Sequence, residues 1–338
     1  TSALEGADAM MRFVLRRLAY ALLTIWGVSF VAFIIIQLPP GDFLTTSIER
    51  MGDDGAVGEA QIAVLREQYG LDQPIWVQYF KWISGIVLHG DFGQSFVYHR
   101  PVAELIGQRL PLTIALSIAT IVFTWAMAVP IGIYSAVRQY SLGDYAVTIL
   151  GFLGLAIPSF LVALVLLYVS YNFFGQDVGG LFSERYIDAP WSFGKVVDLL
   201  KHMWIPVAIT GLAGTASLIR VMRANLLDEL RKPYVAAARA RGNSETRLIV
   251  KYPVRVAIAP LLSTLGAVLP AVVSSGEVVA IVLSLQTTGP LLLSSLQTQD
   301  MYLAGSLIFA VSVLTVVGTL ISDLMLGWAD PRIRHRYS

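Results

Sequence analysis

The chain has 338 residues, of which 56% are hydrophobic and 14% charged, and its formal net charge is +1. Because a soluble domain carries about 25% charged residues, this composition predicts an integral membrane protein, and the small net charge gives no indication of a nucleic-acid partner. The sequence has no Cys, which excludes disulfides and thiolate sites, and its four His residues lack metal-ligand spacing.

The first predicted membrane span is the apolar run from Leu18 to Leu38, which follows three arginines. Its length of about twenty residues is enough to cross a bilayer, and no small-residue cleavage site follows it. We therefore expect a retained transmembrane helix within residues 11–40, with its N-terminus in the cytoplasm. Residues 1–10 are small, polar and unpatterned, and we expect a disordered or non-native leader there.

Residues 41–110 contain no run long enough to span, and we expect a structured external segment with amphipathic helices. Ile62, Leu65 and Tyr69 share one helical face. The run from Ile75 to Leu88 places aromatic residues around a polar stripe, which predicts a second helix. Two placements stay open for it: the membrane interface, or packing on the external face of its own domain.

Residues 111–338 are predicted to form a core of five further spans, which makes the chain an all-α membrane protein with six transmembrane helices. Pro158 interrupts the second of these five spans. Small residues in the third indicate close helix packing, with pore lining as the alternative. The five spans are expected at about 112–135, 145–171, 202–220, 257–282 and 303–328.

Six spans place both termini on one side, and the charges predict that this side is the cytoplasm. Of the 24 Lys and Arg residues, 16 lie in the proposed cytoplasmic parts, whereas the last external loop, residues 284–302, has none. Basic residues concentrate in cytoplasmic loops of membrane proteins. The longest such loop is residues 221–257.

Within this loop a short capped helix is predicted, because Pro233 suits a first helical turn and Gly242 suits the left-handed residue beyond a helix end. Arg239 and Arg241 are expected to project from it. The rest of its surface is expected to be nearly bare, since its other side chains include Ala236, Ala237, Ala238 and Ala240.

A second helix is predicted directly after the first. Asn243 and Ser244 offer N-caps for it, and Pro253 and Pro260 are expected to confine it.

Two carboxylates lie in predicted spans, where an ionised group must face protein or water. Glu277 is a candidate to line a translocation path or to pair with a residue of a partner subunit. The alternative is that Glu277 is a hydrogen-bonded polar residue at a contact between helices. Asp323 lies nearer the membrane surface, where it could pair with an Arg of the same chain. No nucleophile with a base and no cofactor motif is found, so no enzyme is expected.

The segment YVAAARARG, residues 234–242, resembles the cytoplasmic loop of permease subunits in bacterial binding-protein-dependent ABC importers, and in particular the dipeptide and oligopeptide branch. Further motifs follow the order and approximate spacing of the same branch over nearly all of residues 11–334. These motifs are PPGD at 39–42, LREQYGLDQP at 65–74, GDFGQSF at 90–96, RPVAELIGQRLP at 100–111 and IPSF at 157–160.

The resemblance implies that this helix docks in a groove of an ATPase subunit. When the ATPase subunit closes, the helix would transmit that movement to the membrane helices. The residues carried over for coupling are Tyr234, Ala237, Ala238, Arg239, Ala240, Arg241, Gly242 and Asn243. The implied partners are a homologous second permease, two ATPase subunits that hold ATP and Mg, and an external substrate-binding protein, in the bacterial inner membrane. No cofactor is implied in this chain, whose only Gly-Lys pair precedes Val196 and so forms no P-loop.

Departures from the branch concern the cargo and the loop. Related permeases usually carry Glu near Ala280, whereas this chain has Glu277 one turn earlier, and Ala236 replaces the leading Glu of the loop. The turn after the fifth span reads TTGPLL at 287–292, and KYPVR stands at 251–255. Oligopeptides are the expected cargo, with oligosaccharides, opine-like compounds or nickel as alternatives. An ion-coupled carrier that uses Glu277 is the alternative of another class.

Overall fold

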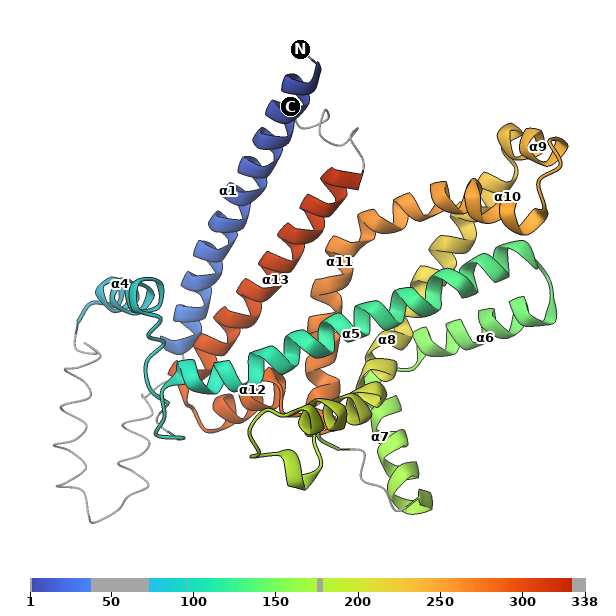
Figure 1. Ribbon diagram of the computed structural model, residues 1–338. Coiled ribbons are helices and arrows are strands. Elements are labelled where there is room, and N and C mark those ends of the chain that lie inside the picture. Colours follow the sequence, from blue (N-terminus) through green and yellow to red (C-terminus); the bar gives the residue numbers. More distant parts are fainter. Residues whose placement is uncertain (1, 38–72, 96, 175–178, 330–338) are drawn as a thin grey trace, which may run out of the picture. The chain divides into compact units, whose positions relative to one another are not determined.

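The computed structural model describes residues 2–37, 73–95, 97–174 and 179–329. These residues form helices joined by turns, with one isolated bridge between Gln94 and Pro101. The described part of the chain divides into two compact units (Figure 1). Predictions for the stop at 39–42, for the helical face of Ile62 and its neighbours, and for the motif that begins at Leu65 lie outside or largely outside the described residues.

Unit 1 comprises residues 1–19, 113–286 and 317–338. Its principal helices are α6 (Leu142–Ala156), α7 (Ser159–Val169), α8 (Phe193–Leu230), α9 (Pro233–Ala240), α10 (Glu245–Lys251) and α11 (Pro253–Val282), together with the second part of α5 (Val102–Val137). Two short segments complete it, a π-helix at Ser170–Phe174 and a 3-10 helix at Glu184–Tyr186.

The core of unit 1 lies where α5, α8 and α11 meet. Its fully buried side chains include Met222 and Leu226 of α8 and Leu261 of α11. On α5, Gly132 faces Met222 so closely that a Cβ at Gly132 would lie 2.7 Å from the Met222 Cβ. The small residue at this position of α5 thus permits close packing against α8.

Unit 2 comprises residues 20–112 and 287–316. It holds most of α1 (Ser2–Gln37), α4 (Ile75–Ser84), a π-helix at Gly85–His89, the start of α5, α12 (Thr288–Gln297) and the first part of α13 (Met301–Ala329). Helix α12 was not expected from the sequence. Its Pro290 stands in the first turn, where the missing N–H costs no helical hydrogen bond.

Helix α4 packs on its own unit through one face. Tyr79 and Trp82 are buried against Phe33 of α1 and Phe309 of α13, and the Tyr79 hydroxyl lies 2.7 Å from the Ser29 hydroxyl. The opposite face exposes large aromatic rings, with Trp76 67% exposed. The packing alternative therefore holds for the buried face, and the placement of the exposed face at the membrane interface stays a prediction.

A buried carboxylate joins the GDFGQSF turn to the start of α13. Asp300 is fully buried and accepts hydrogen bonds from the Ser95 hydroxyl, from the Val97 N–H at 3.2 Å and from the Leu303 N–H at 3.3 Å. The first two donors belong to the segment between α4 and α5. This arrangement supports the expectation that the segment is structured.

Among the described residues, four helices are long and apolar enough to cross a membrane: Met11–Ile35, Val102–Val137, Phe193–Leu230 and Met301–Leu324. In the same residues, α6 and α7 give a fifth span if they count as one, and they are bent by 100°. Pro158 causes the break, because the residue before it, Ile157, takes an extended conformation with ψ 123°. Helix α11 is 30 residues long, but its described apolar part, Val272–Val282, is shorter than a span. The six-span count and the side of the termini stay predictions.

Two local expectations differ from the structure. Residues 2–10, expected to be a disordered or non-native leader, continue α1 as helix, because Ala, Leu and Glu there favour helix formation; their non-native origin stays a prediction. Pro260 was expected to confine the second loop helix. It lies instead inside α11, which begins at Pro253, and an interior proline is tolerated in a membrane helix that has packed neighbours.

The close approach of α5 and α8 predicts that Gly132→Ala destabilises the protein by about 1–3 kcal/mol, because the added methyl group overpacks the seam. Gly107→Ala on the same helix is the matched control, since a Cβ there meets nothing within 4 Å. The apparent melting temperatures of the purified variants in detergent measure this loss of stability. Equal melting temperatures for the two variants would show that the seam is not tightly packed.

Candidate functional site

The predicted loop helix is present as α9, which follows α8 after a short turn (Figure 1). Pro233 is its first residue, Ala240 its last, and Arg241 its C-cap. Gly242 has φ +77°, a left-handed conformation that residues with a side chain rarely adopt. The capped helix predicted between Pro233 and Gly242 is confirmed.

One face of α9 is buried and the other is bare. Val235 is fully buried and Ala238 is 7% exposed, and both pack against Leu248 of α10. Ala238 was expected on the open surface. It is buried because it lies three residues after Val235, on the same helical face. The open surface carries the exposed residues Ala236, Ala237, Ala240, Arg239, Arg241 and Gly242.

The first turn of α9 is held to the last turn of α8. The Tyr234 hydroxyl donates a hydrogen bond of 2.6 Å to the Glu229 carboxylate. Burial, together with this hydrogen bond to Glu229, raises the pKa of Tyr234 to about 12. The phenol therefore stays protonated, and keeps donating, through the neutral pH range.

The last turn of α9 is held to α10. The Arg239 Nε lies 2.6 Å from a Glu245 carboxylate oxygen, and this hydrogen-bonded partner lowers the pKa of Glu245 below its ordinary value. The Asn243 amide donates to the Ala238 carbonyl at 2.8 Å. Asn243 thus closes α9, while Ser244 takes the N-cap position of α10.

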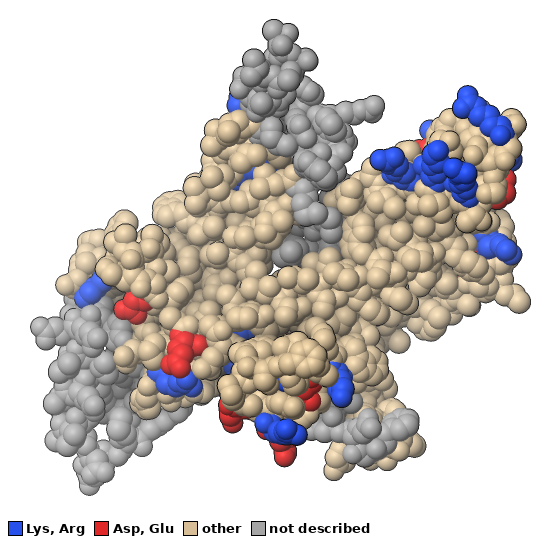
Figure 2. All heavy atoms as spheres, viewed as in Figure 1, with Lys and Arg blue, Asp and Glu red and all other residues tan. Residues whose placement is uncertain are grey.

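The surface over α9 and α10 is rich in basic residues (Figure 2). This charge is the basis of the predicted cytoplasmic location, which stays a prediction. The exposed basic residues of this segment are Arg231, Lys232, Arg239, Arg241, Arg247 and Lys251.

A buried ion pair, which we call the α6–α8 brace, ties α8 to the turn between α5 and α6. The Arg223 Nη2 lies 3.0 Å from an Asp144 carboxylate oxygen, and the Asp144 side chain is only 3% exposed. Asp144 also accepts from the Ser135 hydroxyl and from the Tyr140 N–H at 2.9 Å. The three donors satisfy a carboxylate that would otherwise be costly to bury.

The sequence analysis did not predict the brace. A signal exists: Ser141 is the N-cap of α6 and accepts from the Asp144 N–H at 3.2 Å, which is the Ser-x-x-acid spacing of a helix start. The partner, Arg223, gives no sequence signal of its own. Since α8 runs unbroken from Arg223 to Leu230, only the last turns of α8 and a short turn separate the brace from α9.

Glu277 lies on α11, 24 residues after Pro253, and is partly buried. Its neighbour Gly276 faces Thr210 of α8, with 3.8 Å between the Thr210 methyl group and a Cβ placed at Gly276. Glu277 is thus at the α8–α11 seam and not near α9. The other predicted pair is present: Arg17 Nη1 lies 2.8 Å from Asp323, as expected for an Arg of the same chain.

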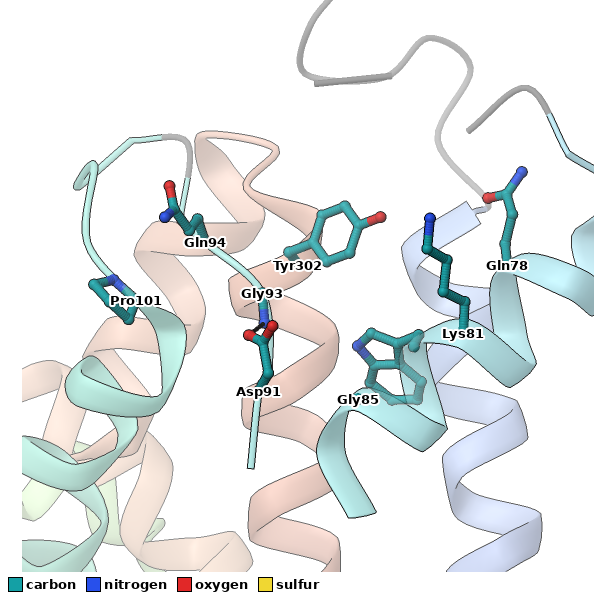
Figure 3. Close-up of a pocket in the computed structure, with 9 residues that line it drawn as sticks. Gln78, Lys81, Gly85, Asp91, Gly93, Gln94, Pro101 and Tyr302 are labelled. Atoms are coloured by element: carbon teal, nitrogen blue, oxygen red, sulfur yellow. Dashed lines mark hydrogen bonds between the residues drawn. The ribbon is translucent and has the colours of Figure 1, made fainter. Parts of the chain in front are cut away.

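A polar cavity of about 320 Å³ lies in unit 2 (Figure 3). Gln78 and Lys81 reach it from α4, Asp91 and Gln94 from the segment after it, and Tyr302 from α13. Charges of both signs line it, so it suits contacts with polar, zwitterionic or backbone groups. Among the described residues no three His, Asp or Glu side chains converge as a metal site would require.

Comparison with known families gives two matches that together cover nearly the whole chain. Residues 128–335 match the model described as binding-protein-dependent transport system inner membrane component. Residues 10–117 match the model for the N-terminal part of such membrane components.

Three relatives are similar over their entire lengths. The oligopeptide transport system permease protein AppB of Bacillus subtilis (strain 168) is 32% identical over 96% of this chain and 100% of its own. The dipeptide transport system permease protein DppB of Escherichia coli (strain K12) is 28% identical over 97% and 100%. The oligopeptide transport system permease protein OppB of Haemophilus influenzae (strain ATCC 51907 / DSM 11121 / KW20 / Rd) is 29% identical over 96% and 100%.

The brace predicts that Asp144→Ala lowers the free energy of unfolding by about 3 kcal/mol, because the Arg223 cation loses its buried partner. Asp228→Ala, at an exposed position of α8, is the control and should stay within about 0.5 kcal/mol of the parent. Urea titration of the two variants in detergent measures both changes. If both variants lower the free energy of unfolding by a similar small amount, the brace contributes little to the stability of the protein.

Proposed function

The chain belongs to the family of binding-protein-dependent transport system inner membrane components, and we propose that it is one of two permease subunits of an ATP-driven importer. It would line half of a shared translocation pathway with a homologous second permease. An external binding protein would deliver the cargo, and two separate ATPase subunits would hold ATP and Mg. The assembly would lie in a bacterial inner membrane.

We assign oligopeptides as the cargo. The support is that full-length relatives from three bacteria are named as oligopeptide or dipeptide permeases. Oligosaccharides, opine-like compounds and nickel are the alternatives within the same class of importer. The ligand that remains bound to the co-purifying external protein distinguishes them, and a peptide is the expected ligand.

The ATPase would dock on the open surface of α9. The observation that carries this proposal is that α9 is held at both ends, by Tyr234 to Glu229 and by Arg239 to Glu245, while Ala236, Ala237 and Ala240 leave its outer face bare. A partner can approach such a face closely, and a firmly held helix transmits a push without bending.

A push on α9 would reach the membrane through α8. Helix α8 runs without a break through the α6–α8 brace to Leu230, and a short turn joins it to α9, so α8 and the α5–α6 turn would move as one body. ATP would then bias the permease between inward-open and outward-open states because it binds them unequally. Glu277, at the α8–α11 seam, is the proposed residue of the translocation path.

Reconstitution tests the function. Proteoliposomes that contain both permeases and the ATPase subunits should accumulate labelled peptide only with ATP and the binding protein. Those that lack this chain should accumulate none. Peptide uptake by this chain alone, driven by a proton or sodium gradient without ATP, would contradict the proposal and favour a carrier that uses Glu277.

The left-handed conformation of Gly242 predicts that Gly242→Val lowers ATP-dependent uptake at least about tenfold, because a β-branched residue is strained at positive φ and must displace the end of α9. A Cβ at this position meets nothing within 4 Å, so the effect is one of backbone conformation. Gly242→Asn is the matched control, since Asn tolerates this region, and it should keep most of the uptake. Both variants should reach the membrane in parental amounts, as immunoblots would show.

Equal uptake by Gly242→Val and the parent would count against docking at α9.

A further inference from the structure

A second cavity, of about 130 Å³, lies in unit 1 between α5, α6 and α8. It shares Ser135 and Arg223 with the α6–α8 brace, but the proposed coupling leaves the cavity itself without a role. The remaining lining residues are Val147, Thr148, Gly151, Phe152, Leu155, Ala216, Ile219 and Arg220.

One end of this cavity is cationic. Arg223 donates through Nη2 to Asp144, but its Nε is buried and has no hydrogen-bond partner among the residues that the structure describes. A buried donor without an acceptor costs about 1–3 kcal/mol. Arg220 lies three residues earlier on the same face of α8, is exposed, and no acidic side chain of the described part pairs with it. Arg220 and Arg223 both line the cavity, and the Asp144 carboxylate pairs with Arg223, so Arg220 leaves a local positive charge.

The other end is apolar. Val147, Gly151 and Leu155 follow one another at four-residue spacing and line one face of α6. Gly151 opens the cavity toward α8, since a Cβ there would lie 3.7 Å from the Ala216 methyl group. Beyond the cavity, α6 exposes Ile149, Leu150 and Leu153, in a helix pair whose composition suits a membrane span.

We propose that this cavity binds an anionic phospholipid. Its phosphate would pair with the guanidinium groups of Arg220 and Arg223, which both line the cavity, and the first part of one acyl chain would lie in the trough formed by α6. Basic pockets between membrane helices bind such headgroups. The cavity is too small for a whole lipid, so the rest of the chain would lie on the exposed apolar surface of α6. A free anion would satisfy the cationic end alone and leave the trough unfilled.

The test compares phosphatidylglycerol with phosphatidylcholine, each titrated into the purified full-length protein and followed by native mass spectrometry. The parent should bind phosphatidylglycerol at least about fivefold more tightly than phosphatidylcholine, because one basic residue near a headgroup contributes about that factor. Arg220→Gln should lower the affinity for phosphatidylglycerol about fivefold, and Arg220→Lys should keep most of it. Arg138→Gln is the matched control, because it removes an equal exposed charge outside the cavity. This variant should keep the parental affinity for phosphatidylglycerol.

Gly151→Ala tests the apolar end without a change of charge, and it should weaken binding of both lipids by narrowing the trough. Equal affinity of the parent for the two lipids, as expected if another protein subunit fills the cavity, would overturn the proposal. An equal loss in Arg138→Gln and Arg220→Gln would also overturn it. Displacement of phosphatidylglycerol by millimolar inorganic phosphate would identify a free-anion site instead.

Discussion

The ion pair between Arg223 and Asp144 fixes the α5–α6 turn to α8, and the proposed transmission of movement from α9 would depend on it. Buried charge is costly, and Asp144 is buried only because three donors converge on it. Beside this pair, Arg220 adds a positive charge to a cavity that opens toward an apolar helix surface. Mechanical coupling and lipid binding would thus meet at one short stretch of α8.

Within unit 1, the small residues have two different roles. Gly132 permits the close contact of α5 with α8 that keeps the helices together, whereas the alanines of α9 leave a surface that a partner can reach. In unit 2 a buried carboxylate has the corresponding role, because Asp300 joins the turn before α5 to the start of α13. In both units, a buried Asp organises a turn between helices.

The sequence predicted features that depend on local chemistry. Pro233 and Gly242 delimit α9 because proline and glycine restrict the backbone wherever they occur, and the break at Pro158 follows for the same reason. What it did not predict depends on distant partners. Ala238 is buried by α10, and Asp144 pairs with an Arg 79 residues away, and the sequence does not identify the partner in either contact.

Cross-linking tests most directly whether α9 receives the ATPase. The chain has no Cys, so Ala237→Cys places a single thiol on the bare face of α9, and Ser84→Cys places one at the exposed end of α4 as a control. A short thiol-to-amine cross-linker added to the purified assembly should join the ATPase to the protein from position 237 and not from position 84. No ATPase adduct at position 237, or equal adducts at both positions, would contradict docking at α9.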